Sequence, residues 1–241
     1  MKDITLFLCI LLLTGCMTNS NNPTPKLVAT RTVVVPTATT EISSVQFPFV
    51  DDFSDNRLNW PTGSWEDDFK SNEASVGPDK LMIQMKSKQA FFHRIYPRNA
   101  PVIPTLQAFT YSLDTHIDKV SRKQGIGIAL IEAHGQSGKS HEFSFWVTGR
   151  EFYFGHRANG VGKAIIGYTV SSAINPSGNN KLTIELHSKT FTLKINDQKV
   201  ARIDVDEVLQ TTQLQGGIVC SQDEADAIAR FEFDNYTIQQ N

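Results

Sequence analysis

Hydrophobic and polar residues alternate in short runs along the C-terminal third of the chain, from Asn180 to Ile238. The runs read KLTIEL, FTLKIN, KVARIDV, GGIVCS and ARFEFDNYTI, and turn residues such as Asn196 and Asp197 separate them. A repeat of two residues places successive side chains on opposite faces of an extended strand. The pattern therefore predicts several antiparallel strands, each with one face toward a core.

Similar runs occur upstream, where Gly, Pro, Asn and Ser residues separate them. A hairpin is predicted around Thr148-Gly149-Arg150, and Asp206 to Gln210 favours one helical turn. Many short strands at regular spacing, without a long helix, are typical of an antiparallel sandwich or barrel. The upstream strands are predicted at 49–53, 81–85, 91–96, 109–115, 126–131, 143–147, 152–154 and 165–170.

A different pattern precedes these strands. An apolar run from Ile4 to Leu13 is too short to cross a bilayer as a helix, which takes about 20 residues. It ends in Leu13-Thr14-Gly15-Cys16, which resembles the bacterial lipobox. The resemblance implies that residues 1–15 are a lipoprotein signal peptide and that the Cys16 thiol carries a diacylglyceryl group. An ordinary secretory signal with a chance cysteine is the alternative.

Residues 16–46 are rich in Thr, Pro and Asn and show no helical period, which favours an extended tether after the lipidated cysteine. The remaining residues, 47–241, would form the folded domain. Two acyl chains anchor a protein stably to a bilayer, so membrane lipid is the expected partner of Cys16. We therefore expect a bacterial cell membrane location, with the domain on the extracytoplasmic side; the pattern does not choose between inner and outer membrane.

Composition excludes some functions. The formal net charge is -2, with 23 Lys and Arg against 25 Asp and Glu, so no basic excess indicates a nucleic-acid partner. The chain has three cysteines. Because Cys9 would be removed and Cys16 modified, Cys220 would be left alone, without an intramolecular disulfide. Its apolar surroundings, GGIVC, predict a buried and unreactive thiol, and an exposed reactive thiol is the alternative.

The order of the runs resembles a known fold. Val50-Asp51-Asp52-Phe53-Ser54-Asp55 opens the domain before Trp60, a glycine-rich strand GIGIALI and a strand FYF follow, and FEFDNY closes it. Together these resemble the concanavalin A-like, or laminin-G-like, jelly roll of bacterial surface proteins. The resemblance implies an all-β, antiparallel jelly-roll β-sandwich over nearly all of 47–241. The fold hosts lectins, glucanases, sugar-hydrolase-like domains and protein-binding modules, so it leaves the function open.

Catalytic residues are not evident. Glucanases of this fold carry Glu-x-Asp-x-x-Glu on one strand, and this run is absent from the sequence. Glu232 and Asp234 would share a face, but they lack the third carboxylate. The six histidines are scattered and show no zinc-binding spacing. We therefore expect no catalytic residue, although hydrolysis of a glycan or keto-sugar at an unplaced site stays open.

A sugar-binding platform is the first candidate site. Trp146 and Tyr153 alternate out of phase with phenylalanines on the same two strands, Phe143, Phe145, Phe152 and Phe154. If the phenylalanines face the core, Trp146 and Tyr153 face the other side of the sheet, where a pyranose ring could stack on them. His156 and Arg157 would supply a polar rim. The alternative is that loops or another sheet cover these residues.

A calcium site is the second candidate. In relatives of this fold the first and last strands pair, so Asp51 or Asp52 could meet Asp234 and offer the hard oxygen ligands that Ca²⁺ prefers. Solvated carboxylates, or pairs with Arg230 or a lysine, are the alternative. No other cofactor is predicted.

These patterns favour a membrane-anchored surface lipoprotein whose domain binds extracellular carbohydrate without catalysis. The partners would be membrane lipid and a polysaccharide. A hydrolase acting on a glycan or keto-sugar is the second hypothesis, and a structural or protein-interaction module of the cell envelope is the third. The oligomeric state is not predicted.

Overall fold

A computed structural model describes residues 47–241, except for 67–69, 88–90, 106, 118–123, 133–140, 177, 205–212 and 225–226. Within these ranges the chain forms sixteen β-strands and no helix, so none of the described segments is a helix able to span a membrane. The predicted signal peptide (1–15), the tether (16–46) and the helical turn at 206–210 lie outside the described residues.

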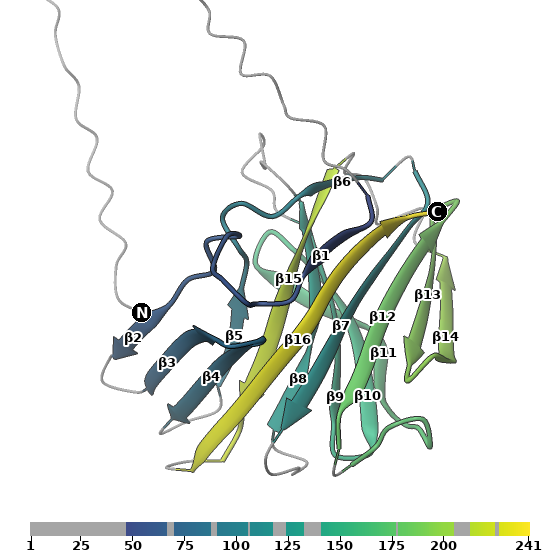
Figure 1. Cartoon of the computed structure of the whole chain (residues 1–241). Helices are drawn as coiled ribbons and strands as arrows, with labels where there is room; N and C mark the ends of the chain where they lie inside the picture. Colours follow the sequence, from purple (N-terminus) through teal and green to yellow (C-terminus); the bar gives the residue numbers. More distant parts are fainter. Residues whose placement is uncertain are drawn as a thin grey trace, which may run out of the picture. The chain divides into compact units, whose positions relative to one another are not determined.

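Two antiparallel sheets make up the described part of the chain (Figure 1). We call them sheet A and sheet B. In sheet A, β1 (Phe49–Asp51) pairs with β16, so the first and last strands lie side by side as expected. The other strands of sheet A are, in spatial order, β14 (Gln198–Asp204), β13 (Thr190–Ile195), β12 (Asn180–His187), β7 (Phe109–Ile117), β16 (Ile228–Gln240), β4 (Lys80–Ser87), β3 (Lys70–Gly77) and β2 (Gly63–Glu66).

Sheet B carries the predicted hairpin, which the structure confirms: β9 and β10 join at Gly149 and Arg150. The short strand β6 (Val102–Pro104) pairs with β15 beside the main path. The remaining spatial order is β11 (Val161–Val170), β10 (Glu151–Ala158), β9 (His141–Thr148), β8 (Gln124–Glu132), β15 (Gln213–Gln222) and β5 (Phe91–Ile95). The architecture is thus the all-β, antiparallel jelly-roll β-sandwich expected from the sequence.

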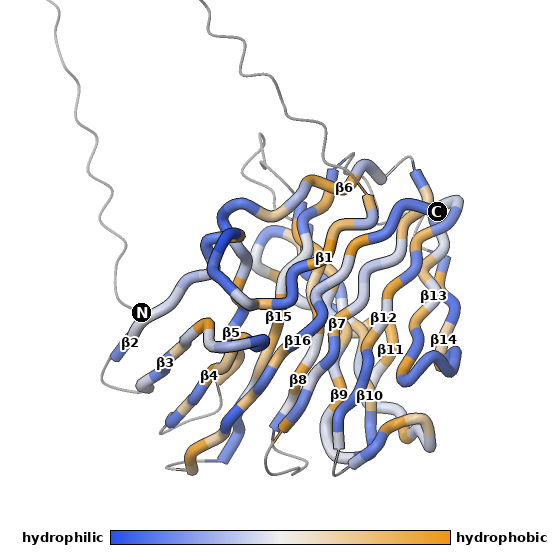
Figure 2. The backbone as a smooth tube through the Cα atoms, viewed as in Figure 1, coloured by the Kyte–Doolittle hydropathy of each residue, from blue (hydrophilic) through white to orange (hydrophobic). Residues whose placement is uncertain are grey.

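The core lies between the inner faces of the two sheets. Hydrophobic and hydrophilic residues alternate along many of the strands (Figure 2). Phe143 of sheet B packs edge-on against Phe191 of sheet A, with ring centroids 5.1 Å apart. Cys220 is 1% exposed, and burial raises the pKa of its thiol, as predicted for an inert cysteine. The alternation read from the sequence therefore sorts side chains into this core.

Three strands were not predicted: β2, β3 and β6. All four residues of β2 are exposed, so it has no apolar face to recognise. The inward positions of β3 include Asn72 and Ala74, which are 3% and 2% exposed but too polar or too small to give an alternating pattern. β6 lies among prolines, which usually indicate a loop. These strands form because neighbouring strands complete their hydrogen bonds, which is a tertiary effect.

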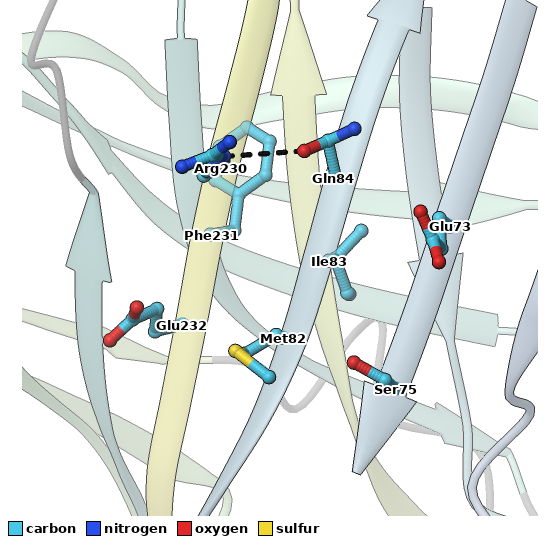
Figure 3. A pocket seen from close by; sticks show the side chains of 8 residues that line it. All are labelled: Glu73, Ser75, Met82, Ile83, Gln84, Arg230, Phe231 and Glu232. Carbon is cyan, nitrogen blue, oxygen red and sulfur yellow. Dashed lines mark hydrogen bonds between the residues drawn. The ribbon is translucent and has the colours of Figure 1, made fainter. Parts of the chain in front are cut away.

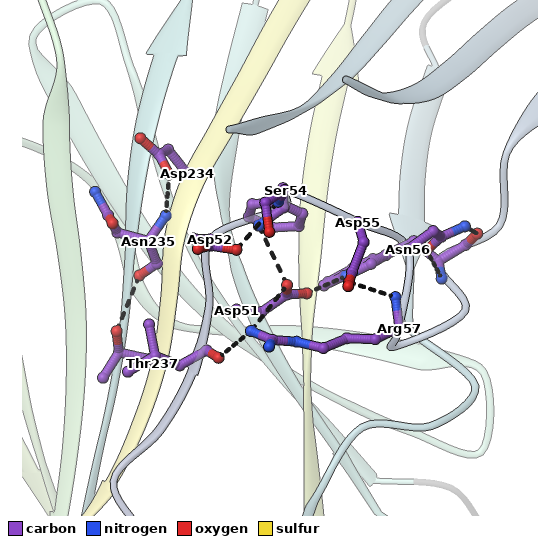
Figure 4. A network of polar contacts seen from close by, with 12 residues as sticks. Asp51, Asp52, Ser54, Asp55, Asn56, Arg57, Asp234, Asn235 and Thr237 are labelled. Atoms are coloured by element: carbon purple, nitrogen blue, oxygen red, sulfur yellow. Dashed lines mark hydrogen bonds and ion pairs between the residues drawn. The ribbon is translucent and has the colours of Figure 1, made fainter. Parts of the chain in front are cut away.

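A buried carboxylate fixes the segment after β1 (Figure 4). Asp51 is fully buried and accepts a hydrogen bond from the Trp60 indole N–H at 2.9 Å and another from the Phe53 amide at 3.2 Å. Arg57 lies 3.7 Å from the same carboxylate and donates to the Val50 carbonyl at 2.6 Å. Phe53 itself adopts a left-handed φ of 56°, so the chain turns there and the strand ends before the predicted residue 53.

Replacing Asp51 with Ala should lower the free energy of unfolding by about 2–4 kcal/mol, because the buried Trp60 indole N–H loses its acceptor. Urea denaturation followed by circular dichroism measures this loss. Asp52→Ala is the matched control, since Asp52 is exposed and accepts from the Ser54 amide at the surface. Equal denaturation midpoints for the two variants would contradict a structural role for Asp51.

Candidate functional site

An aromatic stack lies on the outer face of sheet B. Trp146 of β9 and Tyr153 of β10 are directly paired across the two strands, and their rings stack with centroids 4.0 Å apart at 26°. Both side chains are half-buried. The phenylalanines that alternate with them are all buried in the core: Phe143, Phe145, Phe152 and Phe154. The prediction that these two residues face away from the core is therefore confirmed.

Glycines of β8 create the space for Trp146. A Cβ atom on Gly127 would lie 2.2 Å from the Phe145 carbonyl oxygen and 2.4 Å from the Trp146 Cβ. A Cβ atom on Gly125 would lie 3.1 Å from the indole Cδ1 of Trp146. The ring can lie this close to the sheet only because these positions have no side chain. The glycines of this strand thus leave the space that the Trp146 side chain occupies.

The stack extends in both directions to form a row of four rings. Phe92 of β5 packs against Trp146 with ring centroids 5.0 Å apart, although β15 and β8 lie between their strands. Tyr168 of β11 has its ring centroid 5.3 Å from that of Tyr153, and its side chain is 58% exposed. We call Phe92, Trp146, Tyr153 and Tyr168 the aromatic row.

An open pocket of about 360 Å³ lies over the centre of the aromatic row. All four residues predicted to bind a ligand line this pocket, but the His156 ring stacks on Phe143 at the other face of the sheet. Ligand binding itself stays a prediction. The lining residues are Arg94, Glu142, Ser144, Trp146, Tyr153, Gly155, His156, Arg157, Gly160, Gly162 and Lys163.

Glu142 provides a fixed acceptor in this pocket. It is 6% exposed, forms a hydrogen-bonded ion pair with the Nε of Arg94, and accepts a 2.7 Å hydrogen bond from the Ser144 hydroxyl. The Arg94 guanidinium lies 4.1 Å from the centre of the Phe92 ring. Burial and the Glu142 charge raise the pKa of the neighbouring Tyr96. The carboxylate is therefore held in place by partners from two strands.

Arg157 and His156 differ in position. Arg157 is exposed, is directly paired with Glu142, and donates from Nε to the Gly160 carbonyl at 3.2 Å. His156 is the next residue, so its ring points to the other face, where it stacks on Phe143 at 4.8 Å. It also lies in hydrogen-bond contact with His141 at 3.0 Å. Burial, with the neighbouring His141 charge, lowers the pKa of His156.

Four polar or charged lining residues were not predicted from the sequence: Arg94, Glu142, Ser144 and Lys163. Glu142 and Ser144 could have been found, because they precede Trp146 by four and two residues and so share its face. Arg94 had no such signal: it reaches the pocket from β5 across two intervening strands, which only the folded sheet shows.

The residues predicted to bind calcium are placed differently from each other (Figure 4). Asp51 is buried against Trp60, while Asp52 is exposed. Asp234 follows the core residue Phe233 and is half-buried, opposite Asp114 of β7. Burial raises the pKa of Asp234, and the carboxylates of Asp114 and Asp79 add to this effect.

Asp51 and Asp234 therefore have different neighbours: Asp51 is hydrogen-bonded to the Trp60 indole, and Asp234 lies opposite Asp114. Across the described ranges, no three His, Cys, Asp or Glu side chains are grouped to hold a metal ion. Calcium binding by these residues stays a prediction.

A second pocket, of about 280 Å³, lies on the outer face of sheet A (Figure 3). Glu73 of β3, Gln84 of β4 and Arg230 of β16 form one row across it, because Gln84 pairs with both of the others. Arg230 donates to Gln84 at 3.2 Å. Glu232 also lines the pocket, and Lys80 holds its carboxylate at 2.7 Å. This pocket has polar walls but no stacked aromatic floor.

By sequence, the chain matches no protein-family model and no curated protein. Solved structures do resemble it. A laminarinase from Flavobacterium sp. UMI-01 has a TM-score of 0.57 at 11% identity, covering 80% of this chain and 99% of that chain. A glycoside hydrolase family 16 endo-glucanase from Bacteroides ovatus has a TM-score of 0.56 at 8% identity, covering 80% and 99%.

The catalytic domain of an endo-1,3-beta-glucanase (laminarinase) from Thermotoga petrophila RKU-1 has a TM-score of 0.55 at 11% identity, covering 80% of this chain and 96% of that chain. At these identities the likeness shows the fold alone. It confirms the concanavalin A-like jelly roll expected from the order of strands.

Replacing Gly127 with Ala should lower the free energy of unfolding by about 1–3 kcal/mol and shift the tryptophan emission spectrum, because the new methyl group would meet Trp146 and the Phe145 carbonyl. Urea denaturation and fluorescence measure the two effects. Gly167→Ala on β11 is the control, since nothing lies within 4 Å of a Cβ atom there. If both variants keep the unfolding free energy and the emission spectrum of the parent protein, Gly127 does not make the space that Trp146 occupies.

Proposed function

We propose that this protein is a membrane-anchored bacterial surface lipoprotein whose β-sandwich binds extracellular carbohydrate on the outer face of sheet B. The main support is the Trp146–Tyr153 stack, which forms the base of an open pocket with polar groups at its edges. Ligand pockets commonly combine aromatic surface with a few fixed polar groups in this way.

The chemistry of the pocket suits a sugar. A pyranose ring presents apolar C–H groups on its faces and hydroxyls around its edge. The faces of Trp146 and Tyr153 can pack against the C–H groups and remove them from water. Glu142 can accept hydrogen bonds from hydroxyls, and Arg157 can donate them. Trp146 packs against Gly127, and the Trp146 and Tyr153 rings pack against each other, so their side chains would lose little conformational entropy when a sugar binds.

The fold supports a polysaccharide partner, since the similar solved structures include a laminarinase and an endo-glucanase. A binding role is favoured over hydrolysis by the state of Glu142, which is committed to Arg94 and Ser144. The sequence also lacks the Glu-x-Asp-x-x-Glu run of the glucanases that share this fold. Retaining glycosidases place two carboxyl groups about 5–5.5 Å apart, one as acid and one as nucleophile. Among the described residues that line this pocket, Glu142 carries the one carboxyl group.

Anchoring rests on the lipobox-like Leu13-Thr14-Gly15-Cys16. A diacylglyceryl group on Cys16 would hold the chain at the membrane, and residues 17–46 would connect it to the domain. The aromatic row would then meet polysaccharide on the extracytoplasmic side.

Replacing Trp146 with Ala should weaken carbohydrate binding at least about tenfold, because the largest ring of the platform is lost. Isothermal titration of the purified protein with a panel of polysaccharides, including laminarin, measures the affinity, and circular dichroism checks the fold. Trp65→Ala is the matched control: Trp65 is 37% exposed and lies on β2 of sheet A. Unchanged binding by the folded Trp146→Ala variant would refute the platform.

Replacing Cys16 with Ser should abolish lipidation and move the protein from the membrane to the soluble fraction, because the thiol is the acceptor of the diacylglyceryl group. Metabolic labelling with an alkyne fatty acid and cell fractionation give the two readouts. Cys9→Ser, in the same apolar region, should keep label and location. Membrane-bound, labelled Cys16→Ser protein would show that the anchor lies elsewhere.

A further inference from the structure

Cationic side chains outnumber the carboxylate in the pocket on sheet B. Arg94, Arg157 and Lys163 line it, and Glu142 is its acidic member. The whole chain has a formal net charge of -2, so this excess is local. By contrast, the pocket on sheet A is lined by two carboxylates, Glu73 and Glu232, and one guanidinium. The positive character therefore belongs to the face that carries the aromatic row.

The three cations are not equivalent. Arg94 is neutralised by its ion pair with Glu142. Arg157 lies directly across from Glu142 on β10, and its Nε is used by the Gly160 carbonyl. Its two terminal amino groups make no hydrogen bond with the residues that the structure describes. Lys163 is exposed on β11 and forms no ion pair within those ranges, but it is paired with His156, so its side chain leaves β11 on the opposite face from Arg157. Arg157 therefore keeps its donors for a ligand on the face of the aromatic row.

The β10–β11 turn leaves room beside Arg157. Nothing lies within 4 Å of the position that a Cβ atom would occupy on Gly160 or on Gly162. Both glycines line the same pocket as Arg157. A charged substituent on a sugar ring could therefore approach the Arg157 guanidinium while the ring lies over the aromatic stack.

We propose that the pocket selects an acidic glycan, whose sugar rings stack on Trp146 and Tyr153 while a carboxylate or sulfate group binds Arg157. This inference rests on the proposed function and names its ligand class. A guanidinium forms two parallel hydrogen bonds with a planar carboxylate or with two oxygens of a sulfate. A positive site on a negative protein also concentrates acidic ligands locally, and salt screens this attraction.

Two pairs of polymers test the charge with the backbone held constant. Polygalacturonate is compared with fully methyl-esterified pectin, and dextran sulfate with dextran, by isothermal titration at low and at high salt. The purified full-length protein should bind the acidic member of at least one pair about tenfold more tightly than its uncharged partner. Preference within the first pair assigns a carboxylate, and preference within the second assigns a sulfate.

Variants test whether Arg157 causes the preference for acidic polymers. Arg157→Gln should reduce affinity for the acidic polymer about tenfold. Arg202→Gln is the matched control, because Arg202 is exposed on β14 of sheet A and does not line this pocket. Circular dichroism establishes that each variant is folded.

The outcomes separate the two proposals. Equal affinity for both members of each pair overturns the acidic preference while leaving carbohydrate binding in place. Acidic binding that survives both Trp146→Ala and Arg157→Gln overturns the inference, because the attraction is then not at this pocket. Binding to none of these polymers, nor to laminarin, overturns the acidic preference and the proposed function together.

Discussion

The close contact between Trp146 and the glycines of β8 is the constraint on which the outer face of sheet B depends. Gly127 has no room for a Cβ atom, and Gly125 lies against the edge of the indole. Because the ring occupies that space, it can stack on Tyr153 at one side and reach Phe92 at the other. Larger residues on β8 would push the indole away from the sheet and break the aromatic row.

Two kinds of group then give this surface its chemistry. The aromatic row offers apolar area that a sugar ring can cover, and the ion pair between Arg94 and Glu142 fixes a carboxylate beside it. Arg157 completes the pocket from the neighbouring strand. Sheet A has no matching arrangement over its described pocket, where polar residues and Met82 form the lining. The two faces of the sandwich are therefore chemically different, and sheet B carries the surface at which we propose carbohydrate binding.

Local alternation made much of the fold predictable from sequence. It placed Trp146 and Tyr153 on one face because their strands bury phenylalanines on the other. It could not reveal β3, whose inward face is small and polar, or Arg94, which reaches the pocket across two strands. Asp51 shows the same limit: its carboxylate is a candidate oxygen ligand by type, but the fold buries it against the Trp60 indole.

Hydroxyl-radical footprinting with a bound polysaccharide tests binding at the aromatic row, because it reports which side chains the ligand covers. Binding should lower the oxidation rates of Trp146, Tyr153 and Tyr168, while Trp65 on β2 keeps its rate. Protection of Met82, which is 37% exposed and lines the pocket on sheet A, with Trp146 unchanged would place the ligand on sheet A and contradict binding on sheet B.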